Sequence, residues 1–457
     1  MAQGSNPHRV RNSTLVVRVL ARRQRLRRRD RWSRGALLAH QSRALTELRA
    51  FACDRSSFYR RFHRGMGDAP LGELPVLTKA VVMEHFDEVC TRPEIRIADV
   101  ERYLQSASVD ELLGGRYYVA ATAGTTGRRG VFVWSPAEWV NVVASYNRAF
   151  DWVGSTAGLT RRVRTAVVSS TNPSHQSARV GASVHSRWLP TLRLDAGDPL
   201  PTLVERLNSW QPELLIAYAS MLRSLAVEQL AGRLSLAPGF VFSASEVLTA
   251  STRSLAERAW GRGPHDVYGA TETSGIAAEC GEHRGMHVFD DLVVLEVVDH
   301  ENRPVPAGQY GAKVLVSVLF SRTMPLIRYE MSDSVKLAVD GDCGCGRPYT
   351  LLEGIQGRLQ ETLRFVTPDG GTRDVQPVTF HHVMDTVTAA GWQIVQRPAG
   401  LDVLLARPGD VDTSVLAASL SSALEAQGVV APSVTVRAVD AVPHTALGKA
   451  PLIVRGT

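Results

Sequence analysis

The middle of the chain alternates short β-branched strands with amphipathic helices, and this alternation restricts the fold more than any other feature of the sequence. Strands are predicted at residues 164–169, 213–217 and 239–243, and helices at residues 202–210 and 249–260. Strands and helices that alternate at this spacing form a parallel sheet with helices packed on its faces. The sequence therefore predicts an α/β fold with a parallel core.

The last third of the chain has a different pattern of predicted secondary structure. Beyond Tyr310 it is rich in strands, and after Gly357 it reads strand, helix, strand, strand, helix, strand. The predicted helices and paired strands of this last part are residues 375–388, 393–395, 401–405 and 413–426. A chain of 457 residues is too long for one hydrophobic core. We expect a large N-terminal domain of mixed sheets and helices over residues 1–360, and a small, mobile α+β domain over residues 361–457.

The composition is that of an ordinary globular protein, with 44% hydrophobic and 21% charged residues. A membrane span needs about 18 consecutive apolar residues, and the sequence has no such run. We therefore expect a soluble protein without a membrane partner. The five cysteines are odd in number and unevenly spread, which argues against a disulfide framework and favours the reducing cytoplasm.

The start of the chain is strongly basic. Residues 1–29 hold nine arginines and no acidic residue, and only four of the 52 basic residues of the chain are lysines. An Arg-rich helix or arm over residues 1–35 could be a transit peptide or a nucleic-acid arm. It could also be a solvated basic helix face, because Leu15, Val19 and Leu26 supply an apolar side, and we favour this interpretation. Residues 36–59 and the segment after residue 79 are also expected to be helical.

A loop rich in glycine and threonine lies between two predicted strands, residues 117–121 and 131–134. Its glycines allow backbone amides to approach an anion and its threonines add hydroxyl donors. These residues are Thr122, Gly124, Thr125, Thr126 and Gly127. A Walker loop would continue into a helix after a Gly-Lys pair, and neither feature is present. The loop suits a triphosphate, although a loop of this composition alone is more often an ordinary turn.

Four further motifs follow in order: YGATET at 268–273, the stretch 324–333, GRLQE at 357–361 and PHTALGK at 443–449. With the Gly/Thr loop, they resemble the superfamily of acyl-CoA synthetases, adenylation domains and luciferases. Within it the chain is similar to the phenylacetate-CoA ligase branch, from about Glu73 to the C-terminus. Five motifs in the same order make coincidence improbable.

The resemblance implies an ATP site. The Gly/Thr loop would hold the β- and γ-phosphates, and Tyr268 would stack on adenine beside Gly269. Asp333 would accept hydrogen bonds from the ribose hydroxyls, with Arg358 close by. Ser245 and Glu246 would border the nucleotide. Thr271 would hydrogen-bond near the α-phosphate and Glu272 would bind Mg²⁺, which requires hard oxygen ligands.

The resemblance also assigns a catalytic lysine and a hinge. Lys449, on the small domain, would bridge the substrate carboxylate and the phosphate oxygens, a task suited to a compact ammonium. Glu361 would be the hinge about which the small domain rotates before thiol transfer. The acyl pocket would be lined by Trp134, Ser169, Asn172, His175, Ser243, Ala244, Gly269 and Ala270.

Some positions depart from the usual pattern of the branch. The loop has Ala123 where serine is common, and Arg128 and Arg129 where lysine and proline are common. The hinge is Glu361 instead of aspartate. These differences are compatible with adenylation, and they leave the transfer step open.

Four residues downstream of the YGATET motif have the side chains of a zinc site. Three cysteines and one histidine can form a closed tetrahedron, and similar positions bind zinc in some members of the ligase branch. They are Cys280, His287, Cys343 and Cys345. His283 is an alternative fourth ligand, and unligated buried thiols are the alternative to a metal. With no open coordination position, the zinc would be structural.

The leading hypothesis is an ATP- and Mg²⁺-dependent ligase that activates a small carboxylic acid, inferred from the family to be aromatic, and transfers it to CoA. A second hypothesis gives the acyl group to a carrier-protein thiol, an amine or nitrite in a specialised biosynthetic pathway. A nucleic-acid-binding protein is a third, prompted by the pI of 9.3; we expect no nucleic-acid partner, because no nucleic-acid fold is recognisable. The sequence allows for a homodimer without indicating one.

Overall fold

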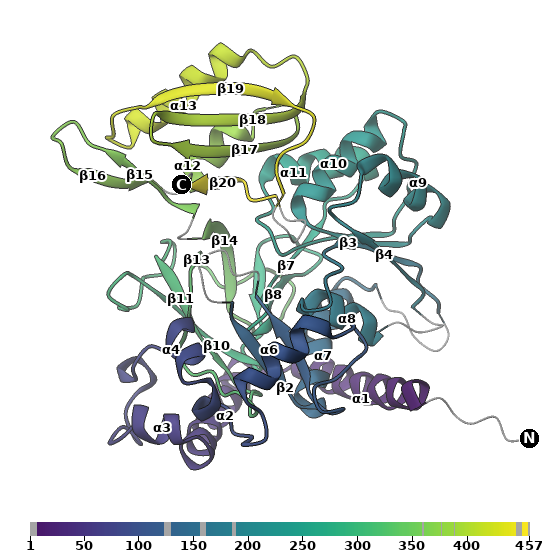
Figure 1. Ribbon diagram of the computed structural model, residues 1–457, viewed down its shortest axis with the longest axis vertical. Coiled ribbons are helices and arrows are strands. Elements are labelled where there is room, and N and C mark those ends of the chain that lie inside the picture. Colours follow the sequence, from purple (N-terminus) through teal and green to yellow (C-terminus); the bar gives the residue numbers. More distant parts are fainter. Residues whose placement is uncertain are drawn as a thin grey trace, which may run out of the picture.

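A nine-stranded sheet forms the centre of the protein, as a computed structural model shows (Figure 1). The structure describes residues 7–122, 129–155, 161–184, 189–358, 361–375, 377–387, 389–444 and 450–455. The strand order is β13-β14-β9-β8-β7-β6-β5-β3-β4. The strands are β3 (Thr165–Ser169), β4 (Thr191–Asp195), β5 (Leu214–Ala217), β6 (Phe240–Ala244), β7 (His265–Ala270), β8 (Ser274–Glu279), β9 (Met286–Val288), β13 (Asp333–Leu337) and β14 (Leu351–Arg358).

The sheet is parallel on one side and antiparallel on the other. β4, β3, β5, β6 and β7 run parallel, whereas β8, β9, β14 and β13 pair antiparallel. The parallel half is interleaved with α8 (Gln176–Val184), α9 (Leu200–Trp210), α10 (Ala219–Leu230) and α11 (Ala250–Trp260). β3, β5 and β6 are mostly buried because helices cover the sheet, which explains the continuous apolar runs of these strands. The predicted α/β fold is confirmed.

Two smaller sheets and one long helix complete this part of the chain. β1 (Tyr118–Ala121) pairs with β2 (Val131–Trp134), and these are the strands predicted on either side of the Gly/Thr loop. α7 (Pro136–Trp152) begins at a capping box of Ser135 and Glu138 and is largely buried. The other sheet consists of β10 (Val293–Val298), β11 (Lys313–Val318) and β12 (Tyr329–Met331).

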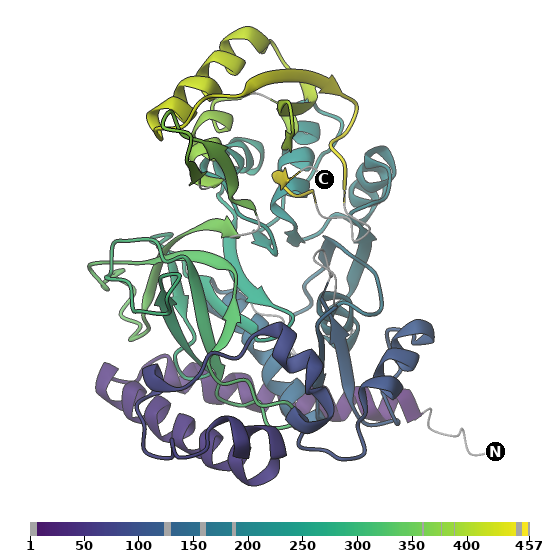
Figure 2. The same cartoon turned by 60° about the vertical axis from the view of Figure 1, so that its left-hand side comes forward.

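The N-terminal segment is a set of helices that packs at one end of the molecule (Figure 2). They are α1 (Pro7–Arg29), α2 (Arg34–Arg55), α3 (Ser57–Phe62), η1 (Leu71–Glu73), α4 (Lys79–Glu84), α5 (Phe86–Val89) and α6 (Ile97–Ser106). The one helix expected at residues 36–59 is two helices. Ser56 caps both helices. Its backbone N–H makes a hydrogen bond at the end of α2, and its Oγ accepts a hydrogen bond from the Tyr59 N–H at 3.3 Å at the start of α3. α1 buries Leu15, Val19 and Leu26 against the body, so the predicted apolar side of the basic helix is confirmed.

The C-terminal segment forms its own core at the opposite end (Figures 1 and 2). Its elements are the hairpin β15 (Leu363–Val366) and β16 (Thr372–Val375), then α12 (Pro377–Met384), β17 (Ala389–Arg397), β18 (Gly400–Pro408), α13 (Thr413–Ala426), β19 (Ser433–Val439) and β20 (Ile453–Arg455). Four of these strands form a sheet in the order β19-β18-β17-β20. The mixed strands and helices of an α+β unit are confirmed, whereas its mobility and the boundary at residue 360 stay predictions.

Over the described residues, no helix combines the length and the apolar character that a membrane span requires.

Candidate active site

Tyr268 of β7 and Asp333 of β13 lie together, although they are 65 residues apart in sequence. The Tyr268 hydroxyl donates a hydrogen bond to Asp333 Oδ2 at 3.0 Å, and both side chains are buried. Asp333 begins β13 and is paired in the strand ladder with Arg358 at the end of β14. The structure thus brings three residues of the predicted nucleotide site to one place through its strand register.

The turn between β7 and β8 carries Thr271 and Glu272. The Thr271 carbonyl accepts a hydrogen bond from Gln176 Nε2 at 2.9 Å, and Gln176 Oε1 accepts one from the Tyr146 hydroxyl at 2.8 Å. Gly269 precedes this turn, and a Cβ atom there would lie 2.7 Å from the Ser274 carbonyl oxygen. Glycine is therefore required for the close approach of the two strands, and α7 and α8 hold the turn in place.

Glu272 extends from this turn toward Tyr329. The Tyr329 hydroxyl donates to Glu272 Oε1 at 3.4 Å. Burial and then the charge of Glu272 raise the pKa of Tyr329 well above its ordinary value, so the phenol remains a donor. A partly buried carboxylate beside a neutral hydroxyl is a suitable oxygen ligand for Mg²⁺.

Glu246 connects the central body with the C-terminal segment. Ser245 before it has a left-handed backbone, with φ of 70°. Glu246 Oε2 accepts from the Ser220 N–H at 2.9 Å, and Oε1 accepts from the Ala450 N–H at 3.2 Å. Lys449 itself lies outside the described residues, but Ala450 follows it directly and places this end of the lysine loop at Glu246.

The Gly/Thr loop is described only at its base. The Thr122 N–H donates to the Gly130 carbonyl at 2.8 Å, and the Gly130 N–H donates to Thr122 Oγ1 at 2.9 Å, so the loop is closed where it leaves β1 and enters β2. The four other predicted phosphate contacts, Gly124, Thr125, Thr126 and Gly127, lie outside the described residues. Arg129 donates to Ser174 Oγ, and Ser174 Oγ donates to Asn172 Oδ1 at 2.6 Å.

Most of the predicted acyl-pocket residues follow the carboxyl ends of parallel strands, where ligands of α/β proteins bind. Ser169 ends β3, Ser243 and Ala244 end β6, and Gly269 and Ala270 end β7. His175 and Asn172 lie on the loop after β3, and His175 Nδ1 is 2.8 Å from Ser170 Oγ. Trp134 is different: it is buried, and its ring contacts are with Phe132 and Trp139.

The predicted hinge lies where β14 ends. Gly357 has a φ of 125°, and a Cβ atom there would lie 2.7 Å from Glu361 Oε2. Arg455 of β20 donates through Nε to the Thr362 carbonyl at 2.8 Å. The segment after Glu361 is thus held by the strand that follows the lysine loop.

The three cysteines and His287 form one cluster. Cys280 Sγ and Cys343 Sγ are 3.6 Å apart, and His287 Nε2 is 3.1 Å from Cys343 Sγ and 3.2 Å from Cys345 Sγ. Burial and then Arg347 lower the pKa of His287 to about 4, so the ring is neutral and can act as a ligand. Sulfur and nitrogen atoms at these separations suit a tetrahedral zinc ion.

His283, the alternative fourth ligand, belongs to another group. Its Nδ1 lies 3.1 Å from Glu279 Oε2, and its ring stacks on His265 at 4.3 Å. The structure therefore favours His287 as the partner of the cysteines.

Sequence reasoning did not find Gln176 or the contact between Glu246 and Ala450. Both act through long-range hydrogen bonds, with sequence separations of 95 and 204 residues. Neither position has a local motif that could have indicated this role.

Comparisons with known proteins agree with these features. No protein-family model matches the chain. The phenylacetate-coenzyme A ligase of Thermus thermophilus is 24% identical over 348 residues, which is 72% of each chain. A 2-hydroxyisobutyryl-CoA ligase in the postadenylation state superposes with a TM-score of 0.70 and 19% identity, covering 92% of this chain and 89% of the other. An anthranilate CoA ligase gives a TM-score of 0.51 with 15% identity, covering 73% and 64%. The motifs and the sequence match make the chain similar to the phenylacetate-coenzyme A ligase branch of adenylate-forming enzymes, and the solved ligase structures share its fold.

Proposed function

We propose that this protein is an AMP-forming acid–thiol ligase, which activates a carboxylic acid with ATP and passes the acyl group to CoA. One observation carries the proposal: Glu246 of the central body accepts a hydrogen bond from Ala450, the residue after Lys449. A lysine that neutralises the reacting phosphate must reach the nucleotide from the other segment, and the contact of its neighbour with Glu246 supports this arrangement. The relatives are themselves named as CoA ligases, which supports the same reaction class.

The roles of the residues follow from their chemistry. The Gly/Thr loop would hold the β- and γ-phosphates, Tyr268 would cover adenine, and Asp333 would accept from the ribose hydroxyls. Glu272 would hold Mg²⁺, whose charge would neutralise phosphate oxygens. The substrate carboxylate attacks the α-phosphorus and pyrophosphate leaves, while Lys449 would stabilise the charge of the transition state. Catalysis here consists mainly of orientation and of charge neutralisation.

The names of the relatives also bear on the identity of the acid and of the final acyl acceptor. Phenylacetate and anthranilate appear in the names of two relatives, and 2-hydroxyisobutyrate in that of a third. Two of these three acids are aromatic, which supports an aromatic substrate. CoA is the acceptor named in all three, and a carrier-protein thiol, an amine or nitrite remains the alternative.

The test is acid-dependent pyrophosphate release across aryl and aliphatic acids, with and without CoA. Lys449→Ala should slow release by about 100- to 1000-fold, the range for loss of one group that stabilises transition-state charge. Lys336→Ala is the matched control, because Lys336 pairs with Glu353 on the sheet edge and should leave the rate unchanged. Release that does not depend on any acid, or that survives Lys449→Ala, would contradict the proposal. A rate that is indifferent to CoA would favour another acceptor.

We further propose that Cys280, His287, Cys343 and Cys345 bind a structural zinc ion, which ties β8 and β9 to the loop before β14. Metal analysis of the purified protein should give one zinc per chain. Cys343→Ser should remove the metal and lower the melting temperature, whereas Cys53→Ser, at a cysteine outside the cluster, should keep it. A metal-free protein of unchanged stability would refute the site.

A further inference from the structure

A cavity of about 560 Å³ lies between α1, α2 and α7, and neither the proposed reaction nor the zinc cluster uses it. Figures 1 and 2 place α1 and the C-terminal sheet at opposite ends of the molecule, so this cavity is remote from that sheet. Its charged lining is mostly cationic, with five arginines, and the rest of the wall is largely apolar. The charged and aromatic members are Arg18, Arg22, Arg25, Arg29, His40, Glu47, Asp291, Phe320 and Arg322.

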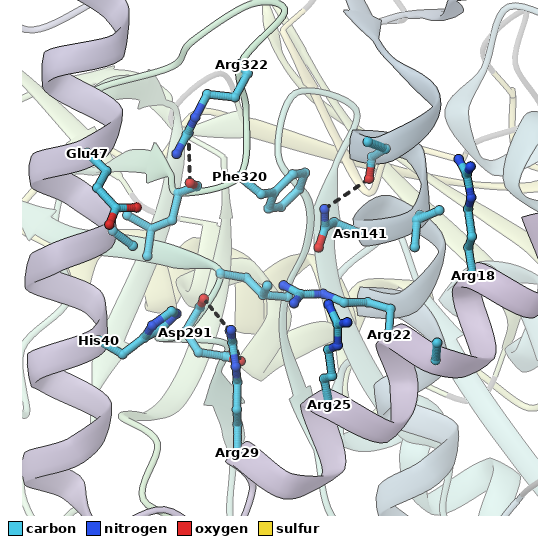
Figure 3. Close-up of a pocket in the computed structure, with 16 residues that line it drawn as sticks. Arg18, Arg22, Arg25, Arg29, His40, Glu47, Asn141, Asp291, Phe320 and Arg322 are labelled. Atoms are coloured by element: carbon cyan, nitrogen blue, oxygen red, sulfur yellow. Dashed lines mark hydrogen bonds and ion pairs between the residues drawn. The ribbon is translucent and has the colours of Figure 1, made fainter.

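Four of these arginines form one face of α1. Arg18, Arg22, Arg25 and Arg29 are spaced by four, three and four residues, so they point to the same side of the helix. Figure 3 shows Arg22 and Arg25 directed toward the centre of the cavity, with Phe320 and Arg322 across from them. Like charges at this spacing destabilise a helix unless another charge compensates them. The face is therefore costly to the fold in the absence of an anion.

Compensation within the chain is incomplete. Arg29 pairs with Asp291 at 3.2 Å, but Asp291 is also bound by Arg148 at 2.6 Å. Within the described part of the chain, Arg18, Arg22 and Arg25 have no hydrogen bond or ion pair, and the Arg22 Nε atom is buried without a partner. Burial and then the charge of Arg29 lower the pKa of Arg22 to about 10. The cavity thus has an unbalanced positive charge.

Of the remaining polar groups, Arg322 adds to the positive charge, Glu47 opposes it and His40 is neutral. Arg322 Nη1 donates to the Leu319 and Ser321 carbonyls at 3.0 and 3.2 Å. Neither bond involves Nη2, the second terminal nitrogen. Two carboxylates line the cavity. Asp291 pairs with Arg29, whereas Glu47 forms no ion pair with an arginine of the cavity among the described residues. Burial and then Arg29 lower the pKa of His40, which keeps that ring neutral.

We propose that this cavity is a binding site for a small polyanion that carries two or more phosphate groups. Guanidinium groups bind phosphate oxygens through paired, charge-assisted hydrogen bonds, and several of them converge here on one concave space. The volume is within the usual range for small-molecule sites. A concave site differs from the extended basic surface that a nucleic acid would require. Phe320 and the apolar wall leave room for an organic part of the ligand.

The probes are inorganic pyrophosphate and ADP, titrated calorimetrically into the full chain. Because the proposed active site also binds such ligands, stoichiometry and location must both be measured. We expect two ADP molecules per chain, and hydrogen exchange should show protection of the α1 backbone on binding. Asp333→Ala should abolish one site without changing the protection of α1, so the two proposals fail independently. A pyrophosphate site without added affinity for ADP would mean that only the phosphates are recognised.

The test variants are Arg18→Gln and Arg25→Gln, whose side chains are exposed and make no bond within the described part of the fold. Each should weaken the α1 site at least about tenfold, which is the loss expected for one charge-assisted hydrogen bond. Arg28→Gln is the matched control, since Arg28 is an exposed arginine of the same helix that does not line the cavity. ADP binding that leaves α1 unprotected, or equal affinity in Arg25→Gln and Arg28→Gln, would overturn the proposal, whereas a single ADP that protects α1 would count against the proposed active site only.

Discussion

Two contact regions join the outer segments to the central body, and they are built from different chemistry. At the N-terminal contact, Arg148 of α7 is 1% exposed and binds Asp30 at 2.7 Å and Asp291 at 2.6 Å. At the C-terminal contact, Arg223 of α10 is 6% exposed and donates to the carbonyls of Val387 and Ala389, each at 2.8 Å. One buried arginine meets carboxylates, and the other meets backbone carbonyls.

This difference determines what happens when each contact opens. Opening the N-terminal contact would leave ionised carboxylates in a protein interior, which costs several kcal/mol. Opening the C-terminal contact would expose neutral carbonyls that water can bind at once. The same contact also includes two bonds to carboxylates: Ser251 donates to Asp385 at 2.8 Å, and the half-exposed Arg407 pairs with the buried Glu228 at 2.6 Å. From this comparison we expect the N-terminal helices to stay fixed and the C-terminal segment to separate more readily, as the proposed two-step reaction requires.

The largest expected effect is at the fixed contact. Arg148→Met removes the cation between Asp30 and Asp291 and should lower the free energy of unfolding by about 3–5 kcal/mol, the range for breaking a buried ion pair. Chemical denaturation followed by circular dichroism measures this value. The matched control is Arg223→Met, a buried arginine of the other contact, which should lose at least about 2 kcal/mol less, because its partners are neutral. Equal losses of unfolding free energy in Arg148→Met and Arg223→Met would contradict the proposed difference between the two contacts.

The N-terminal region should also respond to acid. His63 follows α3 and is buried, and neither ring nitrogen has a partner in the described part of the chain. Burial and then Arg49 lower the pKa of His63 to about 4, from 6.5 in the unfolded chain. The stability from the neutral ring is therefore complete above pH 6.5 and is lost as the pH falls toward 4.

Over that range the wild type should lose about 3 kcal/mol through this group. His63→Phe keeps the ring packing against Tyr59 and Phe62 and removes the titration. Unfolding free energies measured at pH 7 and pH 4.5 should therefore differ less in the variant. An identical pH dependence in both proteins would show that His63 is not protonated on unfolding.

The smallest effect concerns the separable contact and is seen in activity. Arg223→Met should slow acid-dependent pyrophosphate release about tenfold, since a loss of roughly 1.4 kcal/mol shifts the position of the C-terminal segment by that factor. The transfer of a preformed acyl-adenylate to CoA should be unchanged or faster. Arg407→Gln is the control in the same contact, because the half-exposed Arg407 shares Glu228 with Arg233, which keeps the carboxylate paired. Equal slowing of both half-reactions would indicate a structural role only.

The sequence predicted helices and strands correctly where capping residues and apolar spacing determine them. The helix expected at residues 413–426 is α13, because Asp412 caps it and Leu416, Leu420 and Leu424 recur at helical spacing in the core. The hairpin strand β16 was not expected, since its exposed Thr372, Arg373 and Asp374 have no alternating apolar pattern. For the site, the motifs indicated Tyr268 and Asp333 before any geometry was known.

What the sequence could not provide are contacts between distant segments. The arginine spacing of α1 indicated a basic helix face and gave no sign that α2 and α7 enclose a cavity against it. In the same way, Arg148 and Arg223 have nothing in their own sequence that separates an ion pair from a carbonyl contact. Those differences arise only when the partner segments are in place.

The Arg148 cluster also has a consequence for the time at which the protein becomes complete. Tyr349 donates to Asp30 at 3.0 Å across 319 residues of sequence, and it also receives a bond from Arg148. At synthesis rates of about 5–20 residues per second, this partner emerges roughly 15 to 60 s after Asp30. During that interval the nascent chain carries a cationic N-terminal helix, and Asp30 directly after it lacks its last hydrogen-bond donor. Cellular factors that bind basic segments on the ribosome have that interval in which to act.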